Sequence, residues 1–220
     1  MSTKYVICIL TSSDIDSLKM SLESAINQNY DDSLDIFIVV NTLNDHYYEE
    51  ILSYYRNFSL IDKRNRLKKI IRTESNGKPG MGHNSIIDIF REHHCYERLV
   101  ILDGDDMLYP NSINSIDYIY DNSKCDIINL LGNTRFSFNS HDIQNEKKGK
   151  YSIKLNYEIE EMFVNSLCPE FNDILATPSR PISLNRNVLD KLKDYDLYDN
   201  ECAIYDDYKI FLICYVEHFK

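Results

Sequence analysis

The chain has 220 residues, of which 43% are hydrophobic and 12% aromatic, so it can bury the core of one α/β domain and global disorder is excluded. A net charge of −11 excludes a general nucleic-acid binder, because phosphate contacts need a basic face. The six cysteines form no Cys-x-x-Cys pair, and several stand in apolar runs. We therefore expect reduced packing residues and no zinc site or disulfide framework.

Strands and helices are predicted to alternate from the start of the chain. Residues 5–10 form an aliphatic strand, and residues 11–14 offer caps for a helix with apolar residues at helical spacing through Ile26. A second strand, residues 35–40, ends at Asn41. A polar turn and a helix that ends near Phe58 follow it.

The same rhythm continues to residue 122. We expect a short strand at 69–71, a loop at 76–82, a helix that ends near His94, a strand at 99–102 and a helix that starts at Pro110 and Asn111. Such alternation predicts a mostly parallel sheet with right-handed crossovers.

The pattern changes after residue 122. Strands are expected at 126–131, 136–138 and 151–155, an exposed loop at 141–150 and a helix at 157–167. Neither a repeat nor a low-complexity linker divides the chain, so we expect residues 1–220 to form a single domain.

The most informative segment is an apolar strand that stops at three acids. Residues 99–102 read as a strand buried on both faces, and Asp103, Asp105 and Asp106 follow it directly. Ligands of open α/β sheets bind at this end of the strands, and a divalent cation commonly offsets such clustered carboxylates. The alternative is a strand-end turn with solvated acids. The segment matches neither an EF-hand loop nor a phosphatase nucleophile, where threonine would replace Met107.

A loop rich in glycine precedes this strand. Residues 74–84 lead directly into a helix N-terminus, where free amides favour phosphate, and Lys78 and His83 could add donors to a nucleotide. The alternative is a loop with no ligand, because glycine and proline are also ordinary loop formers.

The order of these features resembles the inverting glycosyltransferases of family 2, which have the GT-A fold. The resemblance is carried by Thr11-Ser12 and Asn41 after the first two strands, the loop 76–84, the Asp103-Gly-Asp-Asp segment with Pro110, and Asp206-Asp207 at the start of the last helix. It covers nearly the whole chain. It implies a Rossmann-like, three-layer α/β/α architecture.

The resemblance also implies roles for individual residues. Asp103 would contact the ribose and join Asp105 in binding Mn²⁺ or Mg²⁺, which bridges the diphosphate, while Asp106 would hold the turn or its metal-bound waters. Asp207 would be the general base. The residues implied to contact the nucleotide sugar are Thr11, Ser12, Asn41, Asn76, Gly77, Lys78, Gly82, His83, Asn84, Asp103 and Gly104.

The chain departs from the family pattern at three positions. Asn41 and Asp206 stand where the family usually has Asp and Glu, and His83 stands where it commonly has Arg. The chain has no Trp, so it lacks the Gln-x-x-Arg-Trp motif of processive polysaccharide synthases.

The expected activity is transfer of a sugar from a nucleoside diphosphate, with UDP the expected nucleotide, to a hydroxyl of a glycan, lipid or protein. One alternative is a catalytically silent sugar-nucleotide-binding or scaffolding domain. Another is a sugar-nucleotide pyrophosphorylase, which residues 11–16 disfavour because they contain neither Gly nor Arg.

The sequence also suggests a location. Residues 5–10 are too short for a signal peptide, and no segment approaches the roughly 20 apolar residues that cross a bilayer, so we expect a cytoplasmic protein. Because an apolar helical pattern runs to Lys220, we expect the N-terminal part of a longer polypeptide.

Overall fold

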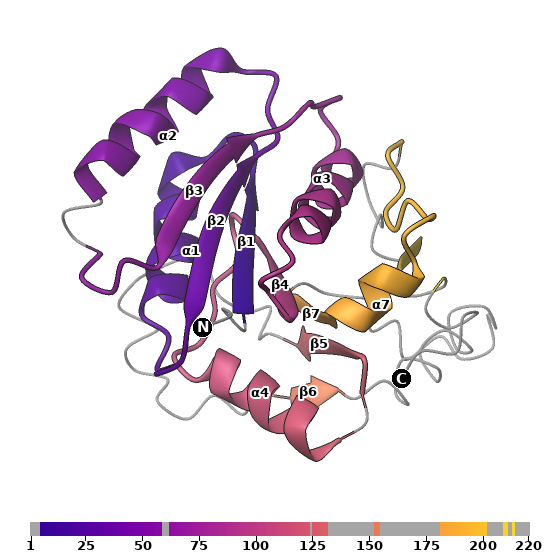
Figure 1. Cartoon of the computed structure of the whole chain (residues 1–220). Helices are drawn as coiled ribbons and strands as arrows, with labels where there is room; N and C mark the ends of the chain where they lie inside the picture. Colours follow the sequence, from indigo (N-terminus) through magenta and orange to yellow (C-terminus); the bar gives the residue numbers. More distant parts are fainter. Residues whose placement is uncertain are drawn as a thin grey trace, which may run out of the picture.

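The computed structural model describes residues 5–58, 62–123, 125–131, 152–154, 181–201, 209, 210 and 213. One sheet organises these residues (Figure 1). Its strands are β1 (Tyr5–Thr11), β2 (Leu34–Val40), β3 (Leu67–Arg72), β4 (Arg98–Asp103), β5 (Ile127–Leu131), β6 (Ser152–Lys154) and β7 (Ile182–Asn185). The helices are α1 (Ile15–Ile26), α2 (Asp45–Phe58), α3 (Pro79–Glu92), α4 (Ser112–Asn122) and α7 (Arg186–Lys191).

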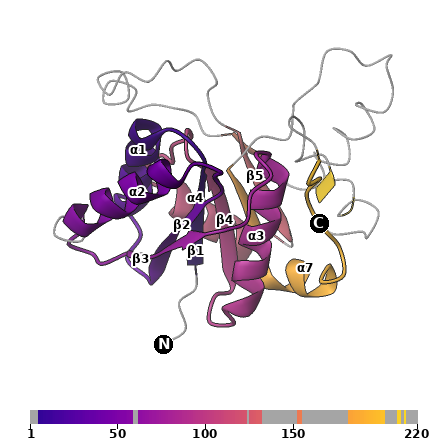
Figure 2. The ribbon, with the colours of Figure 1, turned by 90° about the horizontal axis from the view of Figure 1, so that it is seen from above.

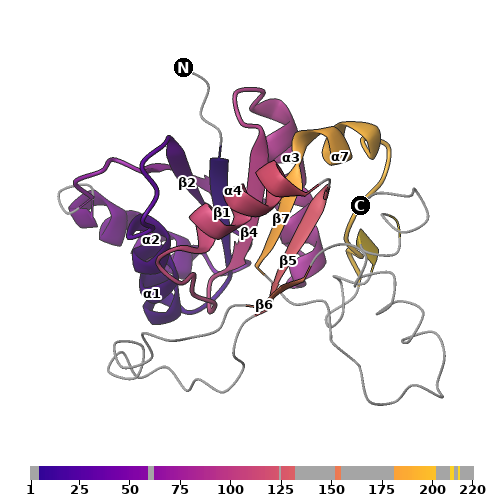
Figure 3. The same ribbon diagram turned by 90° about the horizontal axis from the view of Figure 1, so that it is seen from below.

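The seven strands lie in the order β3-β2-β1-β4-β7-β5-β6. The pairs β1–β2, β2–β3 and β1–β4 are parallel, whereas β7 is antiparallel to both β4 and β5, and β6 is antiparallel to β5. Hence β1 to β5 run in one direction and only β6 and β7 oppose them. The predicted α/β fold with a mostly parallel sheet is confirmed, and β7, β5 and β6 extend it beyond β4 (Figure 3).

Helices cover both faces of the sheet (Figure 2), which confirms the three layers. Every residue of β1 is buried, and its side chains alternate between two apolar clusters. Val6, Cys8 and Leu10 pack with α3 and α7, while the intervening residues pack with α1, α2 and α4. This double burial explains why the strand reads as an unbroken apolar run.

Some elements differ from the sequence-based expectation. α3 begins at Pro79, so the predicted loop 76–82 is wrong in its second half. β7 and α7 were not predicted. β5 and β6 lie within the predicted ranges 126–131 and 151–155. The strand expected at 136–138, the loop at 141–150 and the helix at 157–167 lie outside the described residues.

In the part of the chain that the structure describes, every helix is too short or too polar to cross a bilayer.

Candidate functional site

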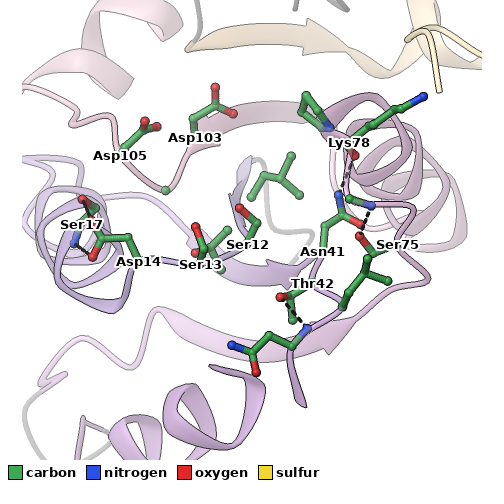
Figure 4. Close-up of a pocket in the computed structure, with 17 residues that line it drawn as sticks. Ser12, Ser13, Asp14, Ser17, Asn41, Thr42, Ser75, Lys78, Asp103 and Asp105 are labelled. Atoms are coloured by element: carbon green, nitrogen blue, oxygen red, sulfur yellow. Dashed lines mark hydrogen bonds between the residues drawn. The ribbon is translucent and has the colours of Figure 1, made fainter. Parts of the chain in front are cut away.

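A cavity of about 540 Å³ opens at the carboxyl ends of β1, β2 and β4 (Figure 4). The chain runs from β1 to its neighbour β2 and on to β3, then returns to place β4 on the other side of β1. The cavity therefore lies where the strand order reverses, which is the usual ligand position in open α/β sheets.

The turn after β4 supplies two carboxylates to this cavity. Asp103 is the last residue of β4 and pairs with Leu10 of β1. The Gly104 amide donates a 2.7 Å hydrogen bond to the Leu10 carbonyl, so the turn lies directly against the end of β1. A side chain at 104 would come within 2.9 Å of that carbonyl oxygen. In Figure 4 the carboxylates of Asp103 and Asp105 project to the same side of the turn.

Three polar side chains hold the backbone of this turn, and we call them the α1 stripe: Ser21 and Ser24 of α1, and Gln28 just beyond its C-terminal cap. The Ser21 hydroxyl, which has a single proton, lies within hydrogen-bonding distance of the carbonyl oxygens of both Asp103 (3.0 Å) and Asp106. Farther along, the Ser24 hydroxyl accepts from the Leu108 amide at 3.0 Å. These contacts fix the turn with protein groups alone.

Gln28 completes the α1 stripe at its C-terminal end. Its Nε2 donates to the Tyr109 carbonyl at 2.7 Å, and its Oε1 accepts from the Ile113 amide at 3.2 Å. Gln28 is fully buried, so both bonds are shielded from water. The stripe thus extends from the carboxylate turn to the start of α4.

His83 contacts Asp103 from α3. The imidazole is 0% exposed, its Nε2 lies 3.1 Å from Asp103 Oδ1, and its ring centroid lies 4.7 Å from that of Tyr198. His83 therefore contacts the candidate metal ligand Asp103 from behind. Because the imidazole is fully buried, it does not line the cavity itself.

The loop before α3 and the first turns of this helix also hold residues 198–201, a segment distant in sequence. The Asn84 side chain donates to the Tyr198 carbonyl (2.9 Å) and accepts from the Tyr198 amide (2.9 Å). Asn76 donates to the Asn200 carbonyl at 2.7 Å, and the Lys78 ammonium lies 2.6 Å from a Glu201 carboxylate oxygen. We call this set of contacts the α3 clasp.

Gly80 allows α3 and residues 198–201 to approach each other closely enough for the α3 clasp to form. A Cβ at this position would lie 2.0 Å from the Asp199 carbonyl oxygen and 2.7 Å from its carbon, both of which are backbone atoms. Glycine is therefore required here by close approach of the two segments.

Replacing Gly80 by alanine should destabilise the protein, although alanine normally stabilises a helix by about 1 kcal/mol relative to glycine. The new methyl group must displace the 198–201 backbone, and overpacking of this kind costs about 1–3 kcal/mol. Urea denaturation monitored by circular dichroism measures the effect. Ser85→Ala in the same helix is the control and should change stability little. A Gly80→Ala protein as stable as the wild type would show that the segments are not in close contact.

Asn41 lies at the end of β2, beneath the start of α3. It is buried, and its Nδ2 donates to the Lys78 carbonyl at 3.0 Å. Among the described residues its Oδ1 has no hydrogen-bond partner. Asn41 therefore ties β2 to α3, and its oxygen is an unused acceptor at the cavity wall.

Eight of the sequence-predicted site residues line the cavity together: Thr11, Ser12, Asn41, Gly77, Lys78, Asp103, Gly104 and Asp105. Four others do not line it: Asn76, Gly82, His83 and Asn84. Asp207, the candidate base, lies outside the described residues.

Sequence reasoning missed several polar residues that complete the lining: Ser13, Asp14, Ser17, Thr42, Asn44 and Ser75. A signal for some of them was present, because Asp14 caps α1. Hydrogen bonds from the Ser17 side chain and from the Ser17 and Asp16 amides lower the pKa of Asp14, so this carboxylate stays ionised at neutral pH.

The charges in the cavity are unbalanced. The lining contains the carboxylates of Asp14, Asp103 and Asp105, and among its residues only Lys78 is cationic, already paired with Glu201. A diphosphate would meet net repulsion here unless a cation accompanied it. Carboxylate oxygens suit hard divalent cations. Within the described ranges no three His, Cys, Asp or Glu side chains form a possible metal site, so Asp103 and Asp105 could supply only part of a coordination shell.

No family model and no curated protein matches the chain. Several solved structures, however, are similar to the chain in fold. S. aureus TarS 1–349 matches with a TM-score of 0.59 and 16% identity over 95% of this chain and 55% of that one. Its complex with UDP-GlcNAc matches with a TM-score of 0.57 and 15% identity over 95% and 53%.

A third similar structure is that of a mannosyltransferase. The mannosyltransferase PcManGT from Pyrobaculum calidifontis, in complex with GDP-Man and Mn²⁺, matches with a TM-score of 0.55 and 14% identity over 94% of this chain and 50% of that one. The chain thus spans about half the length of these three structures. It has the GT-A-like fold of glycosyltransferases, as the sequence resemblance implied.

Proposed function

We propose that this protein is an inverting glycosyltransferase that moves a sugar from a nucleoside diphosphate, with UDP the preferred nucleotide, to a hydroxyl of a glycan, lipid or protein. The observation that carries the proposal is the meeting of the Asp103 and Asp105 carboxylates with the polar ends of β1 and β2 and the start of α3 in one cavity. The fold supports it, because the similar structures include complexes with UDP-GlcNAc and with GDP-Man.

In this proposal the nucleotide occupies the part of the cavity beside β1 and β2. Thr11, Ser12 and Asn41 supply hydrogen-bonding groups at the strand ends, and Gly77, at a φ of +79°, keeps the loop before α3 free of a side chain. The free amides at the start of α3 and the Lys78 ammonium favour a negative group nearby.

Asp103 and Asp105 would hold Mn²⁺ or Mg²⁺, with the remaining ligands coming from the diphosphate and water. Such a cation neutralises charge that develops on the leaving diphosphate. The protein's own contribution is to align both carboxylates, which the α1 stripe does by fixing the backbone that carries them.

The transfer itself requires a base for the acceptor. We assign this role to Asp207 on the strength of the sequence resemblance. Its carboxylate takes the proton of the acceptor hydroxyl while that oxygen attacks the anomeric carbon. The bond from this carbon to the diphosphate breaks on the opposite face, so the products are the inverted glycoside and the free nucleoside diphosphate.

Thermal unfolding tests the donor half of the proposal directly. UDP and GDP are each added with Mn²⁺ and, separately, with EDTA. At about 100 times its dissociation constant, a nucleotide that binds the folded state adds roughly 2.7 kcal/mol of stability. We expect UDP with Mn²⁺ to stabilise the protein and UDP with EDTA not to. If neither nucleotide shifts the transition with Mn²⁺, the proposed function is wrong.

A further inference from the structure

We propose that His83 is a positioning residue: its imidazole donates a hydrogen bond that fixes the Asp103 carboxylate for binding of the divalent cation. This inference rests on the proposed function, and it assigns His83 a role different from the nucleotide contact that the sequence suggested. The two groups come from different elements, α3 and β4, and meet only in the folded protein.

The chemistry of the two side chains indicates which of them donates the hydrogen bond. His83 Nε2 lies 3.1 Å from Asp103 Oδ1, and an ionised carboxylate can only accept. The inferred bond therefore places a proton on His83 Nε2. The bond occupies Oδ1 of a side chain that is 23% exposed and lines the cavity.

Burial makes this bond a rigid support. His83 is 0% exposed, and its ring packs against Tyr198 at 4.7 Å with an interplanar angle of 31°. A fixed, dry donor constrains the torsion of the carboxylate that it holds. The Asp103 backbone is fixed independently, because its carbonyl accepts from Ser21 of the α1 stripe at 3.0 Å. Both the main chain and the side chain of Asp103 are thus held by the protein.

Partners of this kind affect metal binding strongly. Loss of a hydrogen bond to a metal ligand typically lowers metal affinity about 10- to 100-fold. A purely structural histidine would instead change stability without a specific effect on the cation. The two possibilities are therefore separable by experiment.

The test compares His83→Phe, which keeps a ring beside Tyr198 but has no donor, with His83→Gln, whose amide reaches the position of Nε2. Binding of Mn²⁺ in the presence of UDP is followed by the electron paramagnetic resonance of free Mn²⁺. We expect His83→Phe to weaken Mn²⁺ binding by about 10- to 100-fold and His83→Gln to weaken it much less. Phe90→Leu is the matched control, because Phe90 is buried on the same helix and its side chain has no hydrogen-bonding group. It should lower the melting temperature and leave Mn²⁺ affinity unchanged.

The outcomes are distinguishable. Equal Mn²⁺ affinities in the wild type and His83→Phe overturn the inference while the proposed function stands. If the wild type binds no Mn²⁺ with UDP or GDP, the proposed function fails and the inference with it. Should His83→Phe not fold, His83→Asn replaces it, because its amide falls short of Asp103 and should reproduce the loss. Nitrogen-15 spectra of the metal-free protein give a second readout, and an Nε2 without a proton also overturns the inference.

Discussion

Replacing Asp105 by alanine should abolish the Mn²⁺-dependent stabilisation by UDP and leave the unliganded protein as stable as the wild type. The side chain is exposed, so little folding energy depends on it. It is, however, one of only two carboxylates that project from the β4 turn into the cavity. At a UDP concentration that gives the wild type roughly 2.7 kcal/mol, we expect essentially none to remain. Thermal unfolding with Mn²⁺ and UDP measures this loss.

Asp88→Ala is the control for this experiment. Asp88 is an exposed aspartate of α3 that pairs with Arg91 and does not line the cavity. It removes the same charge from the protein and should retain the full shift. A wild-type shift in Asp105→Ala would exclude Asp105 as a metal ligand and would weaken the case for a metal-assisted leaving group.

Replacing Asp207 by asparagine should separate binding from turnover. The amide cannot accept the proton of the acceptor hydroxyl, and loss of a general base typically lowers the rate about 10²- to 10⁴-fold. Stabilisation by UDP and Mn²⁺ should persist, because Asp103 and Asp105 are unchanged. The rate is measured as UDP released from the UDP-sugar that most stabilises the wild type, with a panel of sugar and glycolipid acceptors.

Asp194→Asn provides the comparison, since it makes the same chemical change at an exposed position outside the cavity lining. Transfer by Asp194→Asn at the wild-type rate and its loss in Asp207→Asn would support the base assignment. Undiminished transfer in Asp207→Asn would remove Asp207 from that role. If the wild type binds UDP but transfers to no acceptor, a binding or scaffolding domain becomes the better description.

The three neighbouring parallel strands β2, β1 and β4 could be predicted from the sequence because each has a strong local signal. The unbroken apolar runs ending at Thr11, Val40 and Asp103 are what burial on two faces requires, and their ends are within two residues of the prediction. β7 has no such signal. It consists of four residues, Ile182–Asn185, and it is a strand because it pairs with β4 on one side and with β5 on the other.

The cavity was predictable for a related reason. Parallel strands end at one edge, so residues that follow β1, β2 and β4 in sequence must meet in space. The loop before α3 was predicted less well, because Pro79 starts the helix within the range 76–82 that was expected to be loop. Proline favours the first turn of a helix, so the signal was present. Its effect was to place His83 and Asn84 within α3, where they contact Asp103 and Tyr198.

The α1 stripe has a consequence for how this corner of the protein can vary. Its hydroxyl and amide groups bind main-chain carbonyls and amides of the segment after β4. Main-chain atoms are the same whatever residue is present, so the path of the polypeptide there is independent of which side chains it displays. The residue at position 105 can therefore change during evolution while the backbone that carries it keeps its conformation.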